Sequence, residues 1–194
     1  MLNIWPELPI SVIYDDPPVD TNNVVAALKL KGSVSNIDLT VNSAVWETFA
    51  TVMQDPFPML EYLSVESYCG MTPFISDSFL GGSAPRLQRI LFRDIVFPAL
   101  PNLLLSATDL VELWLWNIPH SGYISPEEMV TSISLLTRLE ELSLQFQSPR
   151  SCPHRAGRFL PPLTRTLLPA LTYLSFKGVT EYLEGLVMTS LYWK

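Results

Sequence analysis

One six-residue pattern, L-x-x-L-x-L with other apolar residues allowed at the leucine positions, recurs along the chain. It occurs as VSNIDL (34–39), LEYLSV (60–65), LQRILF (87–92), LVELWL (110–115), LEELSL (139–144) and LTYLSF (171–176). Successive copies start 26, 27, 23, 29 and 32 residues apart, and a weaker copy, LPISVI (8–13), precedes the first by 26. The spacing is close to the leucine-rich-repeat period of about 20–29 residues. It predicts about seven similar structural units.

The segments between the copies have the periodicity of helices instead of strands. Residues 43–53 place apolar side chains on one helical face, and Ser43 is the expected N-cap. Ser125 and Glu128 form a capping box around Pro126 for a helix that continues through MVTSISLLTRL. Further helices are expected over 22–31, 180–192 and, on the convex side, 100–105. The order of elements is therefore strand, turn and helix, repeated.

A strand and a helix of this size cannot bury their own apolar faces, so neighbouring units must stack. The sequence predicts an α/β fold: an irregular leucine-rich-repeat solenoid over residues 1–194, with a parallel sheet on the concave face and helices on the convex face. The position three residues after the third apolar residue, where regular repeats place Asn or Cys, is Asn only at Asn42. We therefore expect no continuous ladder of polar side chains along the sheet.

Charge and hydropathy exclude several classes of function. The net charge is -7 and the 12 basic residues are not clustered, which argues against nucleic acid or an anionic membrane as the main partner. The N-terminus lacks a signal-peptide pattern, and the most apolar window is broken by Asp109 and Glu112. We expect an intracellular protein, cytoplasmic or nuclear, with Cys69 and Cys152 as free thiols.

The residues that could support catalysis or metal binding are few. His120 and His154 lie in loops without a nucleophile and an orienting acid at a suitable spacing. Cys152 and His154 would supply two metal ligands where a structural zinc site needs four. Pro161 and Pro162 are expected to begin a helix. We expect no enzyme activity, no cofactor and no metal, and a hydrolase that depends on His120 or His154 is the third hypothesis, after the two given below.

Alternation along the strands predicts a binding surface. The third, fifth and seventh residues of each copy should face the concave side, and most of them are polar. The middle of the predicted concave face is different, because LVELWLWN (110–117) places two tryptophans there, and the preceding copy places two arginines beside them. Trp and Arg are enriched at binding hot spots. The predicted protein-binding residues are Trp114, Trp116, Arg93, Arg89, Leu91, Glu112, Tyr62 and Tyr173. Alternatively, a loop or a further part of the chain covers the tryptophans.

Two segments carry a resemblance to a known family. SAPRLQRILFRDIVFPALPNLLLSATDLVELWLWNIPHSGYISPEEMVTSISLLTRLEELSLQFQSPRS (83–151) and LLPALTYLSFKGVTEYLEGLV (167–187) resemble the leucine-rich-repeat region of the F-box-like proteins of mushroom-forming fungi. In that family an F-box binds the adaptor of a ubiquitin ligase and the repeats hold the target protein. The resemblance implies a non-enzymatic protein-interaction scaffold for substrate recognition.

One part of the family pattern is missing from the N-terminal region. Residues 1–33 contain no three-helix F-box signature, and both ends look truncated. We expect the ligase adaptor to bind only if an upstream F-box is encoded. The alternative is a truncated paralogue or partial gene product with no partner of its own.

Overall fold

The structure is a computed structural model that describes residues 8–15, 20–68, 72–147 and 168–190. In these ranges the chain forms one parallel sheet, whose spatial order β1-β2-β3-β4-β5-β6-β7 is the order of the sequence. The strands are β1 (Ile10–Asp15), β2 (Val34–Val41), β3 (Tyr62–Ser67), β4 (Arg89–Arg93), β5 (Glu112–Ile118), β6 (Glu141–Phe146) and β7 (Tyr173–Lys177). The prediction of an α/β fold with a parallel sheet is confirmed, and the weak copy at 8–13 corresponds to β1.

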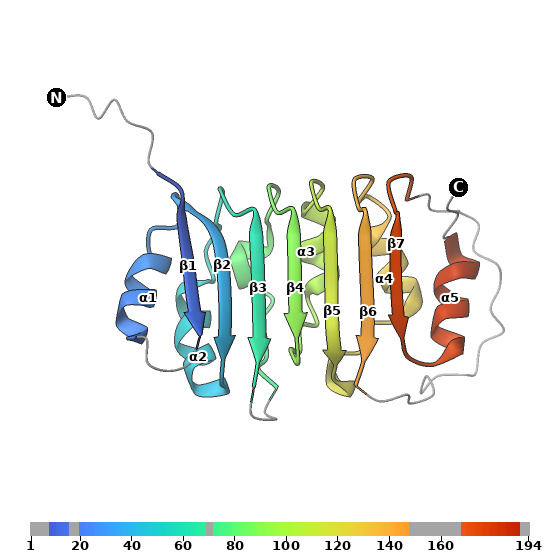
Figure 1. Cartoon of the computed structure of the whole chain (residues 1–194), viewed down its shortest axis with the longest axis horizontal. Coiled ribbons are helices and arrows are strands. Elements are labelled where there is room, and N and C mark those ends of the chain that lie inside the picture. The colour runs from blue at the N-terminus through green and yellow to red at the C-terminus, as the bar shows by residue number, and fades with distance from the viewer. Residues whose placement is uncertain (1–7, 16–19, 69–71, 148–167, 191–194) are drawn as a thin grey trace.

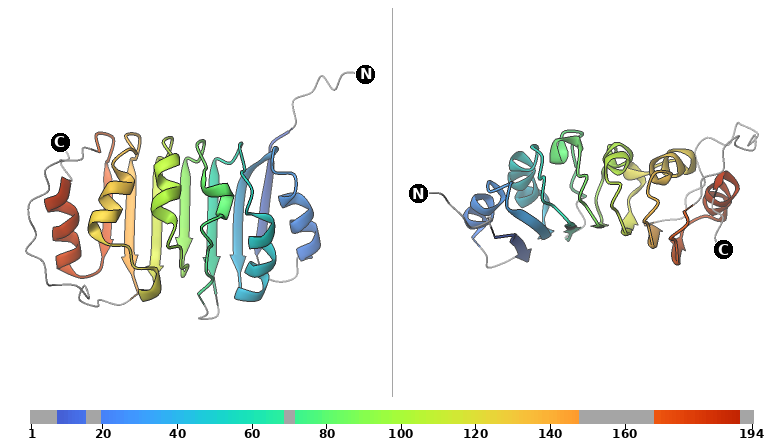
Figure 2. Two further views of the ribbon diagram at one scale, coloured as in Figure 1. Left: turned by 180° about the vertical axis from the view of Figure 1, so that it is seen from behind. Right: turned by 90° about the horizontal axis from the view of Figure 1, so that it is seen from above.

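The helices form a second layer on one side of this sheet. They are α1 (Thr21–Leu28), α2 (Ser43–Val52), α3 (Leu100–Ser106), α4 (Pro126–Ile133) and α5 (Thr180–Ser190), with the short 3-10 segments η1 (Phe79–Gly82) and η2 (His120–Gly122). Figure 1 shows the strands side by side in front of the helices, and Figure 2 shows the two layers from behind and from above. Among the described residues no helix lies on the opposite side of the sheet, and we call that side the open face.

The core lies between the sheet and the helices. The fourth and sixth residues of the pattern point into it, and in β2 to β6 they are buried. They are Ile37, Leu39, Leu63, Val65, Ile90, Phe92, Leu113, Leu115, Leu142 and Leu144. The equivalent Leu174 and Phe176 of β7 are only partly buried. The inward positions predicted from the sequence are therefore buried in β2 to β6, while two outward residues, Ser64 and Ser143, are buried as well.

A turn precedes each strand from β3 to β7. The backbone N–H of the first leucine of the pattern donates to the carbonyl three residues earlier: Leu60 to Phe57, Leu87 to Ala84, Leu110 to Ala107, Leu139 to Leu136 and Leu171 to Leu168, at 3.1–3.2 Å. Pro58, Pro85 and Pro169 occupy the second position of three of these turns, where a φ near -65° is preferred. The prolines thus build the turn that directs the chain into the strand.

Three local features differ from the sequence predictions. Asn42, not Ser43, is the N-cap of α2, because its side chain accepts the backbone N–H of Val45 at 3.0 Å. The capping box of Ser125 and Glu128 is present, but α4 ends at Ile133 and the chain then turns towards β6. Between β3 and β4 the described residues form only η1 in place of an α-helix.

Polar side chains join neighbouring strands where the strands end. Asn42 donates to the hydroxyl of Tyr68 at 3.1 Å, and the side chain of Asn117 donates to Asp94. Asp94 and Asn117 both have positive φ, at 57° and 55°, a conformation that Asn and Asp tolerate better than most residues. These two links join β2 to β3 and β4 to β5. The residues of the second link, Asp94 and Asn117, lie one residue before the position where regular repeats place Asn or Cys.

Candidate binding face

The open face consists of three rows of side chains that run across the strands. Pairing in register aligns Tyr62, Arg89, Glu112, Glu141 and Tyr173 in the row at the amino ends of the strands. The middle row aligns Ser64, Leu91, Trp114, Ser143 and Ser175. The third row places Glu66 beside Arg93 and Arg93 beside Trp116. All eight predicted binding residues therefore lie on the side that the sequence assigned to them.

Trp114 and Trp116 form the centre of this face on β5. Their rings stack with centroids 5.3 Å apart and planes inclined by 14°. Both side chains are partly exposed. The small side chain of Ser143, buried on β6 opposite Trp114, leaves room for the indole N–H of Trp116, which donates to the Ser143 hydroxyl at 3.0 Å. The aromatic pair is thus anchored on the sheet surface and still partly accessible.

The indole N–H of Trp114 differs from that of Trp116. Its Nε1 atom is buried and has no hydrogen-bond partner among the described residues. A buried donor without an acceptor costs about 1–3 kcal/mol, and such groups are rare in folded proteins. Trp114 therefore occupies its place on β5 at some cost in stability.

Two arginines on β4 are held by carboxylates on the strands at either side. Arg93 Nη1 lies 3.1 Å from Glu66 on β3, and its guanidinium lies 4.6 Å from the centroid of the Trp116 ring. Arg89 Nε lies 3.1 Å from Glu112 Oε1 on β5. Ion pairs this exposed contribute about 0–1 kcal/mol each to stability, so their main effect is to orient the side chains. A cation on an aromatic ring adds about 0.5–1 kcal/mol at such a site.

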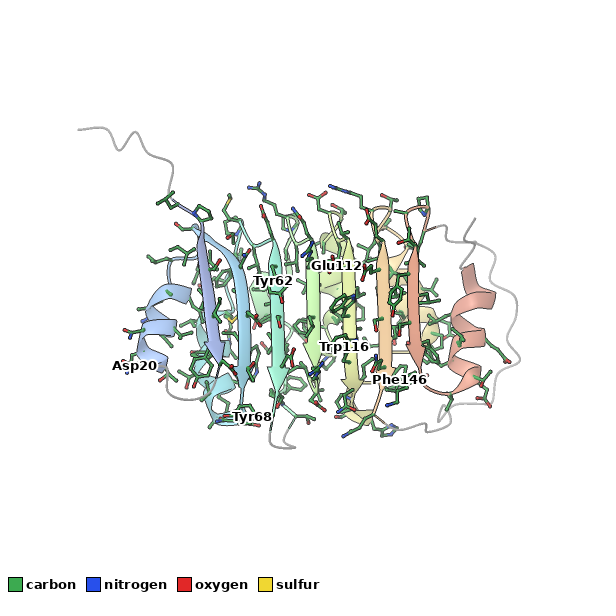
Figure 3. The ribbon with its side chains drawn as sticks, viewed as in Figure 1. Asp20, Tyr62, Tyr68, Glu112, Trp116 and Phe146 are labelled. Carbon is green, nitrogen blue, oxygen red and sulfur yellow. The ribbon has the colours of Figure 1, made fainter. Side chains whose placement is uncertain are left out.

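The remaining predicted residues lie at different distances from this centre. Leu91 is the neighbour of Trp114 on β4, and Tyr62 is the neighbour of Arg89 on β3. Tyr173 lies on β7, two strands from Trp114, and is 53% exposed. Figure 3 shows Tyr62, Glu112 and Trp116 on β3 and β5 of the sheet that faces the viewer. The structure thus brings six of the residues together on β4 and β5, with Tyr62 beside them and Tyr173 apart.

Three further residues belong to this face although the sequence reasoning did not select them. Glu66 holds Arg93, Ser143 accepts the N–H of Trp116, and Glu141 lies opposite Glu112. All three occupy outward positions of the pattern. Residue type alone did not distinguish them from the other polar residues of the face, because their roles depend on which residues lie beside them on the neighbouring strands.

The other candidate residues do not form a site in the described part of the chain. His120 is exposed in η2, while Cys69, Cys152, His154, Pro161 and Pro162 lie outside the described residues. In the described ranges, no three or more His, Cys, Asp or Glu side chains gather closely enough to hold a metal ion. None of the helices described there has the length and the apolar run that a membrane crossing requires.

A small apolar pocket lies behind the sheet, in the core. It is lined by side chains of β4, β5, α4 and α5, including Phe92, Leu115, Met129 and Tyr182. Its lining is mostly apolar, and none of the residues predicted for binding except Trp116 contributes to it.

Comparison with known proteins adds no family to these observations. The chain matches no protein-family model, no curated protein and no solved structure.

Proposed function

We propose that this chain is an irregular leucine-rich-repeat solenoid whose open face binds a protein target, in the manner of the substrate-recognition repeats of a ubiquitin ligase subunit. The repeated turn before each strand supports the first part. A second repeated link supports it too: the N–H of the second residue of each pattern donates to the carbonyl of its counterpart one repeat earlier, at 2.7–2.9 Å. The pairs are Glu61 to Ser35, Gln88 to Glu61, Val111 to Gln88, Glu140 to Val111 and Thr172 to Glu140.

The observation that carries the binding function is the cluster of Trp114, Trp116, Arg93 and Leu91 on a face that no helix of the described residues covers. A chain that needed only to fold could place uncharged polar residues there, as it does at Ser175 and Gln145. Large aromatic and guanidinium groups that are already oriented by neighbours lose little side-chain entropy when a partner binds. Such groups are the ones that dominate binding energies at protein interfaces.

Proximity labelling in cells can test this proposal. We would compare the full chain with a variant that carries both Trp114→Ala and Trp116→Ala, and with Leu105→Ala as the control. Leu105 lies on α3, on the helix side, and is 42% exposed, so its removal takes away apolar surface from the other side of the molecule.

We expect the double tryptophan variant to lose specific labelled proteins that the chain and the Leu105 variant retain. Removing two hot-spot side chains should lower affinity by about 2 kcal/mol or more, which is over tenfold. Circular dichroism would verify that each variant is folded. If the folded tryptophan variant labels the same proteins at the same level, the open face is not the binding surface.

A further inference from the structure

The carboxylates of the open face are not balanced by its own basic groups. Arg93 and Arg89 are already paired with Glu66 and Glu112. Glu141 lies directly opposite Glu112 on the next strand, and no described residue forms an ion pair or hydrogen bond with its side chain. Facing residues of adjacent strands are about 4.8 Å apart, and like charges in that position repel. The fold thus leaves a local excess of negative charge between β5 and β6.

Trp114 borders this acidic spot. It follows Glu112 by two residues on β5, so both side chains leave the sheet on the same side, and Glu141 is its diagonal neighbour on β6. Indole rings attract cations, and the face already shows this contact where the Arg93 guanidinium lies over Trp116. Arg89 reaches Glu112 through Oε1. The second oxygen of Glu112 and the whole carboxylate of Glu141 can therefore accept hydrogen bonds from another cation.

A guanidinium group fits these features better than an ammonium group. It is planar, so it can stack on an indole, and its fork of N–H groups can contact two carboxylates at once. The net charge of -7 would also favour the approach of a basic segment over an acidic one. An acidic segment would have to displace the carboxylates that already hold Arg89 and Arg93.

We propose that the open face takes an arginine side chain of its protein target, seated on Trp114 and held by Glu112 and Glu141. This inference rests on the proposed function and specifies the chemistry of the partner. The arginine would be supplied by an exposed strand or loop of the target, because the face spans several strands.

Peptide libraries can test this directly on the purified full chain. Each library consists of acetylated and amidated nine-residue peptides with random flanking residues and one fixed central residue: arginine, lysine, citrulline or glutamate. Citrulline has nearly the shape of arginine without its charge. We expect the arginine library to retain about tenfold more protein than the citrulline library, with lysine between them.

Glu141→Gln should remove most of this preference. Glu140→Gln is the matched control, because Glu140 is the adjacent, exposed glutamate just before β6, and the two variants have the same net charge. Equal retention on arginine and citrulline, preference for glutamate, or equal losses in both glutamine variants would overturn the proposal. Self-association of the chain that Glu141→Gln abolishes would overturn it too, in favour of a second copy as the occupant.

The labelling experiment separates this inference from the proposed function. If the tryptophan variant loses its labelled proteins but the libraries show no preference for arginine, the open face binds a target of different chemistry. If neither effect occurs, both proposals are wrong.

Discussion

The two tryptophans of β5 should respond in opposite ways when their indole N–H groups are removed. Trp116 donates to Ser143 at 3.0 Å, and Ser143 is 3% exposed, so Trp116→Phe removes a hydrogen bond worth about 1 kcal/mol. Trp114→Phe removes a buried donor without an acceptor and so relieves a cost of at least about 1 kcal/mol. Both variants lose similar apolar area when indole becomes phenyl. The free energy of unfolding of the Trp114 variant should therefore exceed that of the Trp116 variant by about 2 kcal/mol.

Urea unfolding followed by far-ultraviolet circular dichroism measures this difference without using tryptophan fluorescence, which the variants themselves change. Ser143→Ala completes a double-mutant cycle with Trp116→Phe, and we expect a coupling energy of about 1 kcal/mol between them. The same cycle between Ser143→Ala and Trp114→Phe should give a much smaller coupling. Equal stabilities of the two phenylalanine variants, together with no coupling between Trp116 and Ser143, would refute the arrangement of β5 described above.

Three further sets of substitutions test the fold. Leu113→Ala and Leu142→Ala empty fully buried positions and should each cost about 2–5 kcal/mol, whereas Leu174→Ala, at the half-buried equivalent position of β7, should cost distinctly less in the same urea assay. Ser125→Ala should cost about 0.5–2 kcal/mol of stability because it removes the capping box of α4. Asn42→Ala should destabilise the protein more than Ser43→Ala, because Asn42 is the residue that caps α2. Asn117→Ala should cost about 1–3 kcal/mol of stability, because alanine tolerates the positive φ poorly and cannot bind Asp94. Asn117→Gly also loses the hydrogen bond to Asp94 but tolerates the positive φ, so it should cost less. Equal costs would show that φ at this position is not strained.

The sequence predicts the sheet well because one pattern determines several properties at once. In LEELSL, for example, the leucines must face the core and Glu141 and Ser143 must face the other side, so the orientation of β6 and its register with its neighbours follow together. The same pattern located β1 from a weak copy. Spacing by about 26 residues then gave the order of the strands, because each copy can stack only on the next.

The pattern could not predict features that depend on contacts between repeats. The N-cap of α2 was assigned to Ser43 because Ser and Asn both cap helices, and the choice depends on where the strand ends. The repeated order of strand and helix implied a helix between β3 and β4, but Gly81 and Gly82 adopt positive φ there, and a Cβ on Gly81 would project into Pro56. The acceptor for Trp116 lies on another strand, 27 residues away, and no local signal identifies it.

Glu141 shows how stability and binding can make opposite demands on one residue. Its carboxylate faces that of Glu112 and is not compensated by any described basic group, so Glu141→Gln should leave the protein as stable as before or more stable by up to about 1 kcal/mol. Under the arginine proposal, the same substitution should weaken binding to the arginine library, because one of the two carboxylates that hold the guanidinium is lost. A residue retained only for folding would show the reverse, with lower stability and unchanged binding. Measuring both quantities on one variant therefore distinguishes a binding role for the acidic spot from a structural one.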